Sequence, residues 1–198
     1  MKEAFFKPSG GEAHVYSSSD RDNAFVIDGT ISDLYAVGGR KITLLGTLTL
    51  TDLRVLGPAN VTIRSGAAIT NARLARGSGT VLAQEDVDNL YIEDGAWFHE
   101  TAAADAIALV ELHGGLFLPR MSQALTITTL SAYGGRFDAR RHSGLLTISG
   151  GTVWRGATVN LDSGTDLISA TLRRLGGRII GKYTSTGTEV SELPGGAD

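Results

Sequence analysis

Short runs in which apolar and polar residues alternate recur along the chain. One face of each run is apolar and the other carries threonine, which is the pattern of half-buried strands rich in β-branched residues. The clearest runs are Ile42-Thr43-Leu44, Leu48-Thr49-Leu50, Val61-Thr62-Ile63, Leu125-Thr126-Ile127 and Leu146-Thr147-Ile148. Only the alanine-rich segment 100–112 competes as a helix, and its second half, 107–112, fits a strand equally well. The pattern therefore predicts an all-β chain of short strands.

A repeat of twenty residues organises the centre of the chain. Gly95-Ala96-Trp97, Gly115-Leu116-Phe117 and Gly135-Arg136-Phe137 share a Gly-x-aromatic pattern, each twenty residues after the last. The apolar positions before them keep the same spacing: Leu90, Val110 and Leu130, and Ile92, Leu112 and Ala132. A period near twenty, built from short strands and glycine turns, predicts a solenoid in which each coil stacks on the previous one.

Copies of the pattern outside this centre are less regular. Gly79-Thr80-Val81 precedes it, and Gly151-Thr152-Val153 and Gly177-Arg178-Ile179 follow it. Sixteen residues separate Gly79 from Gly95, and sixteen separate Gly135 from Gly151. We interpret all of these copies as coil corners of one irregular solenoid.

Stacking in a parallel β-helix places equivalent residues of successive coils on top of one another. With strands about 4.8 Å apart, residues 42–180 have room for roughly seven coils. Trp97, Phe117 and Phe137 are then expected to form an aromatic ladder in the core. We expect an N-terminal arm or cap over residues 1–40, the β-helix over 41–182 and a C-terminal tail over 183–198.

Composition and charge narrow the classes of function. The net charge of −3 does not favour a general electrostatic contact with nucleic acid. The chain has no cysteine, which excludes disulfides, thiolate metal sites and a cysteine nucleophile. No apolar run is long enough to span a bilayer, and the N-terminal residues do not resemble a signal peptide. We therefore expect synthesis in the cytoplasm and neither a membrane nor a nucleic-acid partner.

Two kinds of segment invite a chemical interpretation. Residues 176–183 (GGRIIGKY) resemble a P-loop, but Tyr183 stands where a Ser or Thr must hold magnesium, and no helix is expected to follow. The acidic clusters Glu85-Asp86-Val87-Asp88 and Glu93-Asp94 could bind a cation or act as paired carboxylates. A coil corner and exposed acidic turns are the simpler interpretations. The four histidines lack metal-binding spacing, so we expect no metal, no cofactor and no catalytic residue.

Two groups of residues are candidates for contacts with a partner. The densest positive patch comprises Arg136, Asp138, Arg140, Arg141 and His142. It suits recognition of an anionic sugar or of a neighbouring subunit's carboxylate, or else forms a solvated loop with an internal Arg–Asp pair. The second group lies near the N-terminus and comprises Phe5, Phe6 and Pro8.

The glycine and aromatic repeat resembles the right-handed parallel β-helix superfamily, the pectin-lyase-like fold. Residues 146–153 (LTISGGTV) and 125–130 (LTITTL) look like coils of bacteriophage tail fibres, spikes and capsid decoration proteins. The resemblance covers about residues 40–182 and implies a right-handed coil. Enzymes of this superfamily are longer and carry catalytic acids or arginines on long loops. No matching motif is present, so no catalytic residue is carried over.

We therefore expect a non-enzymatic structural protein of a phage particle, made in the host cytoplasm. A homotrimer is the expected state, with capsid or tail subunits as partners and a surface glycan as a further one. The alternative is a carbohydrate-binding or polysaccharide-degrading β-helix that acts through Trp154, Arg140, Arg141 and the acidic turns.

Overall fold

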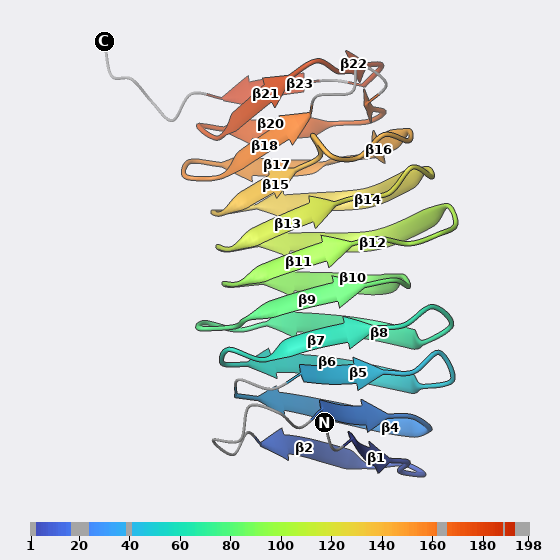
Figure 1. The fold of residues 1–198 in the computed structure, drawn as a ribbon. Helices are drawn as coiled ribbons and strands as arrows, with labels where there is room; N and C mark the ends of the chain where they lie inside the picture. Colours follow the sequence, from blue (N-terminus) through green and yellow to red (C-terminus); the bar gives the residue numbers. More distant parts are fainter. Residues whose placement is uncertain (1–2, 17–23, 39–40, 162–165, 188, 193–198) are drawn as a thin grey trace.

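The chain winds into a parallel β-solenoid of about eight turns, as the computed structural model shows (Figure 1). The structure describes residues 3–16, 24–38, 41–161, 166–187 and 189–192. All of their regular elements are strands, so the predicted all-β solenoid is confirmed. The alanine-rich segment 100–112, which competes as a helix in the sequence, contains the strand β12 over Asp105–Leu112. The right-handedness of the coil stays a prediction.

The first of two sheets has ten strands, all paired in parallel with the next coil. With about 4.8 Å between neighbours, this stack is roughly 43 Å long. Its strands are β1 (Glu3–Phe6), β3 (Ala24–Ile27), β5 (Lys41–Leu44), β7 (Asn60–Ile63), β9 (Thr80–Ala83), β11 (Ala96–His99), β13 (Leu116–Pro119), β15 (Arg136–Asp138), β18 (Thr158–Leu161) and β21 (Arg178–Gly181).

The second sheet has thirteen strands and bends in the middle of each coil. Its strands are β2 (Glu12–Tyr16), β4 (Thr30–Val37), β6 (Thr49–Leu56), β8 (Ala68–Leu74), β10 (Val87–Ile92), β12 (Asp105–Leu112), β14 (Leu125–Ala132), β16 (Leu146–Ile148), β17 (Gly151–Trp154), β19 (Leu167–Ile168), β20 (Leu172–Leu175), β22 (Thr184–Ser185) and β23 (Glu189–Glu192).

Two consecutive residues that are not buried mark the bend in each long strand. In β4 they are Ser32 and Asp33, and in β14 they are Thr128 and Thr129. The strand pairing skips the first residue of each such pair. In the next coil the bend becomes a break, because β16 and β17 both pair with β14. Each coil therefore presents three faces: the first sheet, and the parts of the second sheet before and after the bend.

The interior holds columns of apolar side chains. Trp97, Phe117 and Phe137 lie in register on β11, β13 and β15, and all three are fully buried. The rings of Phe117 and Phe137 have centroids 5.2 Å apart. Val81 continues this column on one side and Val159 on the other. The alignment of Leu90, Val110 and Leu130, predicted from the repeat, is confirmed by the strand pairing.

The two corners of each coil differ in how much their length varies. The corner from the second sheet to the first, here called the glycine corner, has three residues in five coils: 57–59, 93–95, 113–115, 133–135 and 155–157. Gly135 has a φ of 70°, and a Cβ there would lie 2.4 Å from the carbonyl oxygen of Gly114. Glycine is thus needed both for the backbone conformation and for the close packing of coils. The opposite corner, here called the loose corner, varies from two residues at 28–29 to seven at 139–145.

This difference explains the drift of the repeat and corrects one prediction. The 16-residue coil between Val81 and Trp97 has a loose corner of only three residues, 84–86. The prediction that Gly151 continues the Gly-x-aromatic corners is wrong, because Gly151 lies in the second sheet and pairs with Leu130. Phe137 pairs instead with Val159, which is 22 residues later, because the seven-residue loose corner lengthens that coil.

Strands also occur in the segments expected to flank the solenoid. Within residues 1–40, β1 to β4 continue both sheets in register with the following coils. Within residues 183–198, β22 and β23 extend the second sheet. The division of the chain into arm, body and tail stays a prediction.

Candidate functional site

The outer face of the second sheet after the bend carries a groove of about 590 Å³. Along its floor, Tyr35, Arg54, Arg73 and Tyr91 form one column, because the strand pairing places them in register on β4, β6, β8 and β10. Asp52 and Asn71 line one side of this column, and Leu56, Ala75 and Glu93 line the other. The groove therefore runs along the axis of the solenoid and crosses four coils.

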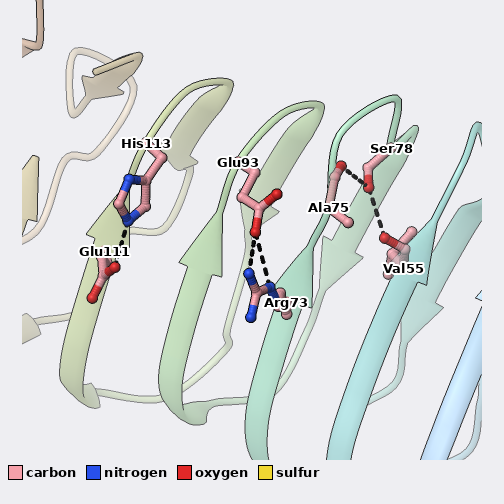
Figure 2. A network of polar contacts seen from close by, with 7 residues as sticks. All are labelled: Val55, Arg73, Ala75, Ser78, Glu93, Glu111 and His113. Carbon is pink, nitrogen blue, oxygen red and sulfur yellow. Dashed lines mark hydrogen bonds and ion pairs between the residues drawn. The ribbon is translucent and has the colours of Figure 1, made fainter. Parts of the chain in front are cut away.

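Hydrogen bonds between coils hold the arginines of the groove in place. Arg54 donates to the hydroxyl of Tyr35 at 3.0 Å and lies 3.5 Å from a carboxylate oxygen of Asp33. Its guanidinium also stands 5.1 Å from the centre of the Tyr35 ring. Arg73 donates through Nε to Glu93 at 3.0 Å, as Figure 2 shows. The Arg73 guanidinium holds the pKa of Glu93 below its usual value.

Amide side chains form a second ladder along the same groove. Asn71 donates to a carboxylate oxygen of Asp52 at 3.1 Å, and Asn89 donates to the side-chain oxygen of Asn71 at 3.0 Å. Each of these side chains is half-buried and bridges two coils. The polar groups of the groove are thus fixed before any ligand arrives, which lowers the entropy cost of binding.

A stacked aromatic row lies further along the same face. The ring of His113 stacks on Tyr133 with centroids 4.8 Å apart, and Tyr133 stacks on Trp154 at 5.9 Å. Figure 2 shows His113 beside Glu111, one coil beyond Glu93. Tyr133 and Trp154 are more than 40% exposed. Parallel stacking turns the ring faces along the solenoid axis, so mainly ring edges face outward.

The positive patch predicted from the sequence lies on β15 and in the corner after it, and it is an ion cluster centred on one carboxylate. The guanidinium of Arg140 donates two hydrogen bonds of 2.8 Å to the carboxylate of Asp138, and Arg136 lies 2.6 Å from the same carboxylate. Asp138 is only 6% exposed. The hydrogen bond from Arg140 lowers its pKa despite burial. The internal Arg–Asp pair is therefore present, and Arg141 beside it is exposed.

His142 lies inside the solenoid wall, which differs from the surface role expected for it. It is 3% exposed, and its Nε2 lies 3.0 Å from the carbonyl oxygen of Gln123. Its Nδ1 is enclosed with no hydrogen-bond partner among the described residues. Burial lowers the pKa of His142 below the usual 6.5, so the ring is neutral at physiological pH.

The N-terminal candidates lie on or beside the first strand of the first sheet. Phe6 aligns with Ile27 in an interior column but is 48% exposed, because β1 is the end of the sheet. Pro8 is half-buried and accepts a backbone hydrogen bond from Thr30. Phe5 belongs to β1, and its side chain lies outside the described part of the structure.

The acidic turns bind the backbone and side chains of neighbouring coils. Asp94 accepts hydrogen bonds from the N–H groups of Gly95 and Gly77, which lower its pKa. Glu85 accepts from Ser65 and from the N–H of Gly66. A hydrogen bond to Glu85, together with burial, raises the pKa of Asp86 to about 6. For Glu85, burial raises the pKa, but the hydrogen bonds outweigh it and the pKa is lowered.

The P-loop-like segment and a buried His–Asp pair both belong to the framework of the solenoid. The P-loop-like segment forms strand β21 where a nucleotide site would need a helix. His99 and Asp105 form an enclosed pair in the core, with Trp97 donating to the other ring nitrogen at 3.5 Å. Across the described ranges, no group of three or more His, Asp or Glu is arranged to hold a metal ion. The same ranges contain no helix suited to crossing a membrane.

The four residues of the groove column are not among the candidates predicted from the sequence, although Glu93 beside them belongs to a predicted acidic cluster. Tyr35, Arg54, Arg73 and Tyr91 are spaced by 19, 19 and 18 residues, which is the coil length. This spacing was the available signal, but the residues differ in type and the repeat is irregular in that part of the chain.

Comparisons with known proteins found no relative for this chain. No family model and no curated protein matches its sequence, and no solved structure matches its fold.

Proposed function

We propose that this protein is a non-enzymatic structural protein of a bacteriophage particle. It serves as a capsid decoration or cement protein, or as part of a tail spike or fibre, and it assembles as a homotrimer. The observation that carries the proposal is the unbroken solenoid with short corners, which have at most seven residues in the described part of the chain. A rigid rod of this kind suits a spacer or a clamp, while catalytic clefts are usually built from longer loops.

Exposed apolar side chains support a role in assembly. Tyr133 and Trp154 form an exposed aromatic row on one lateral face, which suits side-by-side association of three copies. Phe6 at the N-terminal end of the first sheet suits contact with a capsid or tail subunit. These two surfaces lie on different parts of the rod, so one can serve the trimer and the other the particle.

The mass in solution tests this proposal. Light scattering coupled to gel filtration should give three times the chain mass of 20.8 kDa, about 62 kDa. Trp154→Ala should shift the protein toward monomer, while Phe98→Ala, another exposed-face aromatic substitution, should leave the trimer intact. A monomer at micromolar concentration for the wild type would contradict the trimer.

A polysaccharide-degrading activity is the alternative. The observation in its favour is the Glu85–Asp86 carboxyl pair, whose pKa values are pushed apart as an acid–base pair requires. Incubation with polysaccharides followed by viscometry distinguishes the two functions. A loss of viscosity that Asp86→Asn abolishes would overturn the structural proposal, and unchanged viscosity would support it.

A further inference from the structure

We propose that the groove formed by Tyr35, Arg54, Arg73 and Tyr91 binds an uncharged oligosaccharide that lies along the axis of the solenoid. This inference does not depend on the proposed virion function, and a binding site in this groove is compatible with either an enzymatic or a structural role.

Charge balance excludes a polyanion as the favoured ligand. The groove lining contains two arginines, Arg54 and Arg73, and two carboxylates, Asp52 and Glu93. Arg73 is paired with Glu93, and Arg54 lies beside Asp33. Without surplus positive charge, the groove offers little attraction for a phosphate backbone or a sulfated chain, since such ligands are held by unpaired Lys and Arg.

The position of the groove in the sheet excludes pairing with an extended peptide. The groove lies over β6 and β8, which are interior strands with both edges paired to neighbouring coils. A peptide added to a sheet needs a free strand edge for its main-chain hydrogen bonds. This face offers only side chains to a ligand. A ligand that binds here must therefore carry polar groups along its own length that can bond with those side chains.

The chemistry that remains is that of a hydroxyl-rich, uncharged chain. Guanidinium and amide N–H groups are fixed donors, while the oxygens of Asp52, Asn71 and Glu93 are acceptors. Tyr91 adds aromatic surface at one end of the column. Tyr35, at the other end, stacks on the ring of His14 with centroids 4.4 Å apart and has the Arg54 guanidinium 5.1 Å from its ring centre, so it offers mainly its ring edge. The column spans three coil steps, or about 14 Å, so the ligand is an oligosaccharide and not a single sugar.

A binding screen followed by calorimetry tests the inference. The probe is a glycan array that displays neutral and anionic oligosaccharides together with monosaccharides, and the strongest neutral hit is then titrated into the intact protein. We expect neutral oligosaccharides of three or more residues to bind in preference to monosaccharides. Arg73→Ala and Asn71→Ala should each raise the Kd by about tenfold or more.

A matched control separates the groove from general effects on the coils. Arg64 also donates to the next coil, to Gln84 at 3.1 Å, but it lies outside the groove. Arg64→Ala should change the Kd by less than about twofold. Circular dichroism and melting curves check that each variant is folded. If Arg73→Ala does not fold, Asn71→Ala tests the groove in its place.

Three outcomes would overturn the inference: no oligosaccharide bound above background, binding of anionic glycans alone, or an unchanged Kd in the folded groove variants. None of them bears on the mass in solution or on viscosity, so the proposed function and this inference fail or survive separately.

Discussion

Replacement of Phe117 by alanine tests whether the aromatic ladder supports the solenoid. Phe117 is fully buried on β13, in register with Trp97 on one side and Phe137 on the other. Truncation of a buried Phe to Ala costs about 3–5 kcal/mol, and the cost is highest where the surroundings cannot collapse. Here the strands above and below are fixed by parallel pairing along their length, so we expect the upper half of that range.

The same strand region provides a control of matched chemistry. Phe98 lies on β11, points outward and packs under the guanidinium of Arg120, which is 4.0 Å from its ring centre. Phe98→Ala loses a cation–π contact and a half-buried ring, so we expect a cost of about 1 kcal/mol. The difference between the two variants therefore measures the value of the interior position.

Guanidinium denaturation followed by circular dichroism measures both costs, and hydrogen exchange locates the damage. Since each coil contacts only its neighbours, protection should fall most in the coils of β11, β13 and β15. For a chain of this size, the expected loss corresponds to a melting temperature lower by roughly 8–20 °C. If Phe117→Ala costs no more than Phe98→Ala, the ladder is not what stabilises the centre of the rod.

Three further variants test other parts of the structure. Gly135→Ala should cost at least about 2 kcal/mol more than Gly77→Ala in denaturant melts; both have positive φ, but of the two only Gly135 has another coil where a Cβ would lie. The pKa of His142 is lowered by burial, so the unfolded chain binds a proton more readily. Stability should therefore fall as the pH drops through about 6.5, and His142→Gln should remove part of that loss in melts at several pH values. Asp138→Asn should cost about 1–3 kcal/mol in urea, since it leaves two arginines without their carboxylate; an unchanged midpoint would show that the cluster is only a surface contact.

Much of the fold could be predicted from local signals. The alternation of apolar residues and the regular Gly-x-aromatic spacing identified the strands, the solenoid and the register of Trp97 with Phe117 and Phe137. These signals are local because each coil packs against the next at a nearly fixed distance along the chain. The prediction for Gly151 fails because a seven-residue loose corner precedes it, and such an insertion leaves no trace in the alternating pattern.

The groove could not be predicted for a different physical reason. Its column includes Tyr35 and Arg54, which follow the bend in β4 and β6. At the bend two consecutive residues point away from the core, so the alternation between inside and outside changes phase by one residue. Simple alternation from the strand start would place Tyr35 on the wrong face. The side chains that line the groove become visible as a set only when the position of the bend and the coil length are both known.

The unequal corners make this rod a suitable scaffold for the display of inserted peptide loops. Glycine corners fix the pitch, since a Cβ at Gly135 would collide with the coil below. Loose corners already accept between two and seven residues while the strands on either side keep their pairing. A foreign epitope or recognition loop inserted at the exposed residues 102–104 of the loose corner 100–104 would therefore project from one edge of the rod without shifting the coils on either side. Several such inserts at successive loose corners would stand in a row at intervals of about 4.8 Å, an array whose spacing is set by the backbone alone.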